Sequence, residues 1–238
     1  MKQKLKLLLI SFCILICSCQ SINRSKTDFD LPKNQVYFLF DDGPNTRDDT
    51  TARLLDVLKK YQIKGYFSLM GENVNLDPGL AVRIHDEGHI IVNHGYSDKW
   101  AYRMSKSEFR NNLIMGETAI SQALGFGLEQ KLYQPHGGYY LKKHEKIFLE
   151  EGYTLFPASI RVYDAAASAK DKNRIVKNAI KKTVEHGGGI ILLHDMRDSF
   201  TRSEKELAKN PHGSFNRSWI PDAVEEIIIG LLDKGFVF

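Results

Sequence analysis

The sequence predicts a single α/β domain built on a mainly parallel sheet. From Val36 to the end of the chain, segments of strand character alternate with segments of helical periodicity, as when helices connect the strands of a sheet. The strand segments are short, uninterrupted apolar runs, which are typical of strands buried on both faces. This alternation leaves open whether the sheet is open or closed into a barrel.

Each expected element has a local signal. The first strand, Val36 to Phe40, runs directly into two carboxylates and a Gly-Pro pair. Ser105 and Glu108 form a capping box, and Pro221 suits the first turn of a helix. Most strands end in His, Asp, Asn or Gln, which suits a site at the C-terminal mouth of a barrel. Further strands are expected at 65–70, 90–93, 131–134, 153–157 and 189–193, and helices at 46–61, 78–87, 105–123, 141–151, 171–185 and from 221 onward.

The N-terminus carries the pattern of an export signal. Three lysines precede an apolar run from Leu7 to Ile16 of roughly 10 residues, too short for a bilayer span of about 20. Ser18 before Cys19 resembles the bacterial lipoprotein cleavage signal, with Cys19 as the lipid-bearing residue; an ordinary signal peptide or an uncleaved anchor is the alternative. We therefore expect a signal peptide at 1–18, a polar tether at 19–34 and one domain at 35–238, lipid-anchored in a bacterial cell envelope on its periplasmic or outer surface.

Composition limits the metal ligands and the charged partners that can be expected for the mature domain. All three cysteines lie within the first 19 residues, so any metal must be held by His and carboxylate side chains. Without the three signal-peptide lysines, 30 Lys and Arg residues face 29 acidic ones, a charge near +1 that gives no reason to expect nucleic acid binding. Removal of the signal leaves about 219 residues, the size of one domain.

Two motifs contribute carboxylates and a histidine. Asp41 and Asp42 are adjacent, so they repel each other unless a cation or a proton lies between them. A metal on one and a proton-accepting task for the other would satisfy both, whereas the plain alternative is that Asp-Asp-Gly-Pro is only a turn. His94 and Asp98 are spaced i, i+4 after a strand, so both can reach one ion.

Two further motifs lie at strand ends. The stretch from Tyr133 to Gly138 carries a proline and two glycines, which let the backbone approach a ligand closely. His194 ends the buried strand before Asp195. A lone histidine at a strand end is usually a surface or capping residue, but four such elements at the same ends of strands indicate one site.

Together these motifs resemble the NodB-type polysaccharide deacetylases, carbohydrate esterase family four. The matches are FDDGP at 40–44, GYFSLMGENV at 65–74, DEGHIIVNH at 86–94 and LLHD at 192–195. The resemblance covers nearly the whole mature domain. It implies a distorted (β/α) barrel of about seven parallel strands and metal-dependent hydrolysis of N-acetyl, sometimes O-acetyl, groups on a polysaccharide.

The resemblance also implies residue roles. Asp41 is the expected general base and His194 the general acid, and Asp42, His94 and Asp98 are the expected metal ligands. Zn²⁺ is the simplest metal, with Co²⁺ or Ni²⁺ as alternatives. A backbone N–H near Gly137 is expected to stabilise the oxyanion, and Leu192 with Tyr133 or Tyr139 to wall the acetyl methyl. The expected substrate and oxyanion residues are Tyr133, Gln134, Pro135, His136, Gly137 and Leu192, with Asp164 in support.

The sequence departs from the family pattern at several of these positions. Asp98 stands where the family has a second metal histidine, and Gln134 where it has an arginine that orients the catalytic aspartate. Ala165 follows Asp164 where tryptophan is expected, which removes one wall of the site. His136 replaces a proline and could be a substrate contact or an extra ligand. The polar segment 196–219 is longer than usual; it could fold over the mouth, with Trp219 as the missing wall, or be a solvated loop.

Three functions follow from these observations. The first is a deacetylase that removes N-acetyl groups from peptidoglycan or another glycan of the cell envelope. The second is an esterase that removes O-acetyl groups with the same site. The third is a non-catalytic member that binds glycan or a partner, which the changes at Asp98 and Gln134 support. The expected partners are an acetylated polysaccharide and a membrane, reached through a lipid on Cys19, and the protein is expected to be a monomer.

Overall fold

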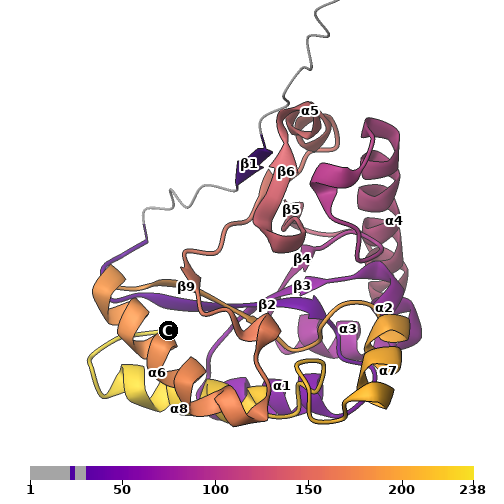
Figure 1. Ribbon diagram of the computed structural model, residues 1–238. Coiled ribbons are helices and arrows are strands. Elements are labelled where there is room, and N and C mark those ends of the chain that lie inside the picture. Colours follow the sequence, from indigo (N-terminus) through magenta and orange to yellow (C-terminus); the bar gives the residue numbers. More distant parts are fainter. Residues whose placement is uncertain (1–21, 25–30) are drawn as a thin grey trace, which may run out of the picture.

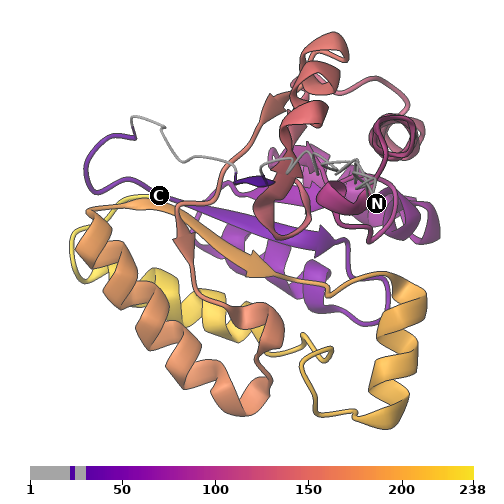
Figure 2. The same ribbon diagram turned by 45° about the horizontal axis from the view of Figure 1, so that its top comes forward.

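A curled parallel sheet forms the centre of the molecule (Figures 1 and 2). The computed structural model describes residues 22–24 and 31–238. Seven strands pair in parallel in the order β7-β5-β4-β3-β2-β9-β8, so the expected distorted barrel of about seven strands is confirmed. Within the described residues no pairing joins β7 to β8, and the barrel is open between them. The strands are β2 (Val36–Gly43), β3 (Tyr66–Leu69), β4 (Ile90–Asn93), β5 (Leu132–Tyr133), β7 (Thr154–Leu155), β8 (Ile160–Arg161) and β9 (Gly189–His194).

Helices surround the sheet, and six of them lie where the sequence predicts. The helices are α1 (Thr50–Lys60), α2 (Gly71–Leu76), α3 (Pro78–Asp86), α4 (Lys106–Leu124), α5 (Lys142–Glu150), α6 (Lys172–His186), α7 (Phe200–Lys209) and α8 (Ile220–Leu232). Two were not predicted. α2 is only 6 residues long, and α7 has few apolar residues and buries only Ser203. Short 3₁₀ turns lie at Ala101–Arg103, His136–Gly138, Asp164–Ala166 and Ala169–Asp171.

The two faces of β2 pack into different parts of the core. Phe38 and Phe40 belong to the apolar cluster that also includes residues of α1 and α8. Leu39 belongs to a second cluster, with Leu192 of the neighbouring strand β9. Because side chains alternate along a strand, Asp41 shares the face of Leu39. The alternation of β2 therefore directs the Asp41 side chain to the same side of the sheet as Leu192.

Part of the predicted tether is a strand. β1 (Ile22–Arg24) pairs antiparallel with β6 (Tyr139–Leu141), which follows the glycine pair of the third motif. The predicted signal peptide and Cys19 lie outside the described residues, so both stay predictions. Among the helices of residues 22–24 and 31–238, none is both long enough and apolar enough to cross a bilayer.

Candidate active site

An irregularity at the end of β2 brings its two carboxylates to one pocket. In a regular strand, adjacent side chains point to opposite faces. Here the pairing of β2 with β3 shifts register between Phe40 and Gly43, and Asp42 has a left-handed backbone with φ of 69°. Asp41 and Asp42 both line the same pocket as a result. The strand therefore continues through Asp41 and Asp42, and the irregularity in its pairing with β3 groups the two acids.

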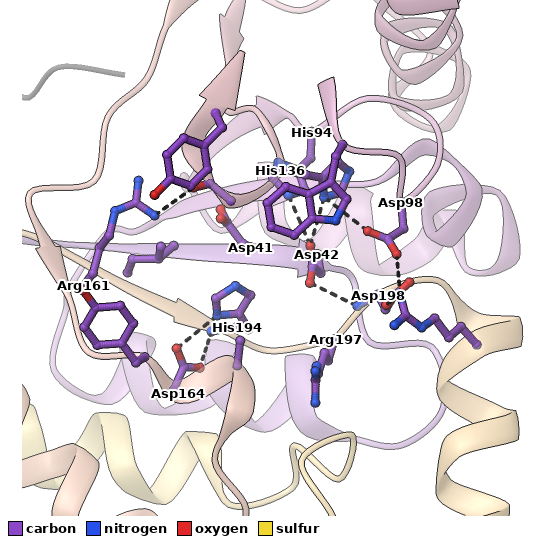
Figure 3. Close-up of a pocket in the computed structure, with 17 residues that line it drawn as sticks. Asp41, Asp42, His94, Asp98, His136, Arg161, Asp164, His194, Arg197 and Asp198 are labelled. Atoms are coloured by element: carbon purple, nitrogen blue, oxygen red, sulfur yellow. Dashed lines mark hydrogen bonds and ion pairs between the residues drawn. The ribbon is translucent and has the colours of Figure 1, made fainter. Parts of the chain in front are cut away.

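Three buried side chains form a group that could hold a metal ion (Figure 3). One donor atom each from Asp42, His94 and His136 lies within 4.8 Å of the other two. Asp42 Oδ1 is 3.1 Å from His94 Nε2 and 3.6 Å from His136 Nδ1. Two imidazoles and one carboxylate are a frequent ligand set for catalytic zinc, which keeps a further position open. The sequence left two roles open for His136, a substrate contact or an extra ligand. Its position beside Asp42 and His94 favours the second.

Neighbouring groups hold this trio in place. His94 Nδ1 lies 2.5 Å from the Gln134 carbonyl oxygen and donates its proton there, which leaves Nε2 free to face Asp42. The backbone N–H of Asp198 donates to Asp42 Oδ2 at 3.0 Å. Burial opposes ionisation of Asp42, but the imidazoles of His136 and His94 outweigh it and keep the Asp42 pKa well below its ordinary value. The Asp42 carboxylate is therefore in the ionised form that a metal requires.

Asp98, the third ligand expected from the sequence, is not in this trio. Its Oδ1 lies 3.7 Å from His136 Nδ1, and its Oδ2 accepts a hydrogen bond from Arg202 Nη1 at 3.1 Å. Arg202 comes from α7 and also pairs with Asp198. The Asp98 carboxylate therefore lies next to the trio, and its negative charge is balanced by Arg202 of the 196–219 segment.

Asp41 is buried beside the trio with only 2% of its surface exposed. Burial raises the Asp41 pKa above its ordinary value, against the opposing attraction of His94 and His194. The hydrogen bond that Gln134 could make to Asp41 is not formed. Within the described residues, Asp41 Oδ1 and both polar side-chain atoms of Gln134 lack a hydrogen-bond partner. Asp41 thus keeps an oxygen available and has the raised basicity expected of a proton acceptor.

His194 lies on the strand next to Asp41 and is held by Asp164. β2 and β9 pair so that Asp41 and His194 are direct neighbours. Asp164 accepts from the His194 backbone N–H at 2.9 Å and from its ring Nδ1 at 3.0 Å (Figure 3). Burial alone would lower the His194 pKa, but the Asp164 carboxylate outweighs it and raises the pKa to about 9. His194 is therefore a protonated imidazole at neutral pH, fixed in orientation by Asp164.

A buried arginine on the far side of Asp164 was not identified from the sequence. Arg217 has no exposed surface and donates to Asp164 Oδ2. It lies in the polar segment 196–219, where an arginine is expected to be exposed to solvent. No sequence signal marks it, because its burial depends on contacts with residues distant in the chain, such as the His194 carbonyl.

The pocket, of about 370 Å³, also has aromatic and backbone walls. Leu192, Tyr139, Gly137, Trp100 and Tyr163 line it. Gly137 has φ of 64°, and a Cβ there would lie 2.8 Å from the Trp100 ring, so this position requires glycine. Tyr133, Gln134 and Pro135 are not among the lining residues.

Trp219 does not supply the missing wall, so that expectation was wrong. Its side chain is 5% exposed and belongs to the main apolar cluster. Its indole N–H donates to the Asn216 carbonyl at 3.0 Å. The segment 196–219 nevertheless borders the pocket, because Arg197, Asp198 and Arg202 line it.

Asn73 of α2 ties this segment to the end of β2. Its side-chain NH₂ donates to the Asp42 carbonyl at 2.8 Å, and its oxygen accepts from the Phe200 N–H at 3.2 Å. We expect Asn73→Ala to lower the free energy of unfolding by about 1–3 kcal/mol, because it leaves buried backbone groups without partners. Urea denaturation tests this, with Asn75→Ala of the exposed Asn75 as the matched control. Equal stabilities of the two variants would contradict the role given to Asn73.

Known proteins match this chain over most of its length. The family described as polysaccharide deacetylase matches residues 29–156. A peptidoglycan-N-acetylglucosamine deacetylase of Bacillus cereus is 29% identical over 208 residues, which cover 87% of this chain. The chain spans 66% of that relative's length, just under two thirds.

Solved structures agree with the sequence matches. The Bc1960 peptidoglycan N-acetylglucosamine deacetylase has a TM-score of 0.69 and 29% identity, covering 85% of this chain and 84% of that one. A family 4 acetyl xylan esterase from Clostridium thermocellum, in complex with a cobalt ion, has a TM-score of 0.65 and 25% identity, covering 84% and 85%. The chain therefore belongs to the polysaccharide deacetylase family.

Proposed function

We propose that this protein is a metal-dependent deacetylase that removes N-acetyl groups from a glycan of the cell envelope, with peptidoglycan as the substrate class. One observation carries the proposal: a buried carboxylate of raised pKa and a protonated histidine lie on neighbouring strands beside a group of three potential metal ligands. A protein that only binds glycan has no need of both a base and an acid. This argues against the non-catalytic alternative.

The residues present fit a divalent cation. Asp42, His94 and His136 would hold it, since their side chains are buried and one donor atom of each lies within 4.8 Å of the other two. Nitrogen and oxygen donors suit Zn²⁺, and Co²⁺ or Ni²⁺ would be accepted by the same set. When bound, the cation supplies Lewis-acid polarisation of an acetyl carbonyl and acidifies water.

The chain's own residues would divide the proton transfers. Asp41 takes a proton from the attacking water, for which its raised pKa and unpaired oxygen suit it. His194 gives a proton to the leaving amine, and Asp164 balances its charge. Leu192 and Tyr139 bound the space for the acetyl methyl, and the oxyanion is assigned to a backbone N–H near Gly137.

The metal assignment predicts which side chain completes the site. His136→Ala should abolish stoichiometric metal binding, because it removes one of three protein ligands. Asp98→Ala should lower metal affinity by no more than about 10- to 100-fold, the effect typical of a residue next to a ligand. Metal content by mass spectrometry and the visible spectrum of the Co²⁺ protein measure both variants. Loss of metal in Asp98→Ala with retention in His136→Ala would contradict this assignment and restore the one expected from the sequence.

The substrate is tested by acetate release from a panel of glycans. We expect the fragment 20–238 to release acetate from N-acetylglucosamine oligomers and from peptidoglycan, the substrate in the names of two similar proteins. Acetylated xylan tests the O-acetyl alternative, which the similarity to an acetyl xylan esterase keeps open. Release from the xylan alone would make the protein an esterase.

Anchoring is a separate part of the proposal. Cys19 would carry the lipid that holds the enzyme in the cell envelope, on its periplasmic or outer surface. Two acyl chains would hold it firmly, since one chain gives only marginal membrane binding. Cys19→Ser should then move the protein from the membrane fraction to the soluble fraction. An unchanged distribution would refute the lipid anchor.

A further inference from the structure

We propose that Arg217 is a positioning residue for the catalytic acid, which it holds in place through Asp164. Asp164 joins the two side chains: one of its carboxylate oxygens accepts from His194 Nδ1 at 3.0 Å. The other accepts from both the His194 backbone N–H, at 2.9 Å, and Arg217 Nη2. The inference rests on the proposed function, because it concerns the proton that His194 would donate.

All three nitrogen atoms of the Arg217 guanidinium donate hydrogen bonds in this arrangement. Arg217 Nε donates to the His194 carbonyl at 3.1 Å, and Nη1 donates to the Asp164 carbonyl at 3.1 Å. Nη1 also reaches the carbonyls of Ala167 and Ser214, each at 3.3 Å. Arg217 therefore contacts both the backbone and the side chain of Asp164, and the backbone of His194. A planar fork with five fixed donors can do this, and a lysine cannot.

The environment makes this contact strong. Arg217 and Asp164 have side-chain exposures of 0% and 1%, so water does not screen their charges. The Trp219 ring lies 5.0 Å from the guanidinium. Burial would favour neutral Asp164, but His194 and Arg217 outweigh it and keep the Asp164 pKa below its ordinary value. Burying the Arg217–Asp164 ion pair costs desolvation free energy, so a contribution to stability alone is a weak reason for its presence. Its link to His194 through Asp164 suggests the positioning role instead.

Arg217 also explains what the long segment 196–219 contributes. The segment leaves β9 directly after His194, forms α7 and returns so that Arg217 lies beneath the same strand end. The site lacks an arginine at Gln134, on the side of the base, but has this one on the side of the acid. The geometry thus assigns the segment a role in orienting His194, in addition to bordering the pocket.

The leaving group separates a positioning role from a structural one. An amide needs the proton from His194, whereas an activated ester such as 4-nitrophenyl acetate leaves without it. We expect Arg217→Gln to reduce kcat for an N-acetylglucosamine oligomer by at least about tenfold, with little change for the ester. Arg217→Lys, which keeps the charge but not the fork, should lie between. Arg53→Gln is the control. Arg53 Nη1 donates a hydrogen bond to the Ser218 carbonyl at 3.1 Å, in the same segment 196–219, but Arg53 does not contact Asp164.

Equal losses on amide and ester, or no loss on either, would overturn the proposal. If Arg217→Gln does not fold, Arg217→Lys decides by the same ratio of amide to ester activity.

A second readout needs no turnover: the proton between His194 Nδ1 and Asp164 should give a downfield NMR resonance that is present in the parent and in Arg53→Gln. We expect it to shift or broaden in the Arg217 variants. An unchanged resonance would refute the positioning role even in a protein that proves inactive, and inactivity of the parent would count only against the proposed function.

Discussion

Asp41→Asn is expected to reduce acetate release on the order of 10²- to 10⁴-fold, the contribution of a positioned general base. The asparagine keeps the size of the side chain but cannot accept a proton. Fold and metal binding should be preserved, because Asp41 is outside the trio of Asp42, His94 and His136. Initial rates on an N-acetylglucosamine oligomer measure the loss, and metal content is measured on the same sample.

The control is Asp233→Asn, which makes the same change at an exposed aspartate after α8. It should retain the parent rate. Substantial activity in Asp41→Asn would remove Asp41 as the base. Loss of metal together with activity would instead place Asp41 among the ligands, which disagrees with the observed grouping.

His194→Ala is expected to produce the second large effect, and its size should depend on the leaving group. Because a poor amine leaving group needs a proton, we expect a loss on the order of 10²- to 10⁴-fold for amides. Activated esters should lose much less. Parallel measurement of an N-acetylglucosamine oligomer and 4-nitrophenyl acetate gives this ratio, and equal losses would argue against an acid role for His194.

The same residue predicts the pH dependence. His194 has a pKa raised to about 9, and it must be protonated to act as an acid. Activity should therefore be present below this pKa and fall as pH rises through about 9. Asp164→Asn removes the carboxylate that raises the pKa, so the alkaline limb should move to lower pH. An alkaline limb at the same pH in parent and Asp164→Asn would show that another group titrates there.

The fold was predictable because its signals are local and periodic. The strand before Asp41 and the capping box at Ser105 both lie where the sequence places them. α7 was not predicted: it has few apolar residues and buries only Ser203, and its Arg202 lines the pocket. Its position depends on contacts such as that of Asn73 with Phe200, which join residues far apart in the chain.

The site was predictable as a set of motifs but not as a set of contacts. The family resemblance placed Asp42 and His94 together as ligands, but only the structure shows that His136, from another strand end, lies grouped with them. Spacing along one turn says nothing of how two loops approach each other. Arg217 illustrates the same limit, since its burial depends on the path of the segment that carries it.

Metal titration of activity tests the central claim most directly. The protein is stripped with chelator, Zn²⁺ is added back, and acetate release from an N-acetylglucosamine oligomer is measured against bound metal. We predict no release from the stripped protein and a rise that ends at one ion per chain, with no such rise for His136→Ala. Release that is unaffected by chelation, or none at any occupancy with Zn²⁺, Co²⁺ or Ni²⁺, would contradict a metal-dependent deacetylase.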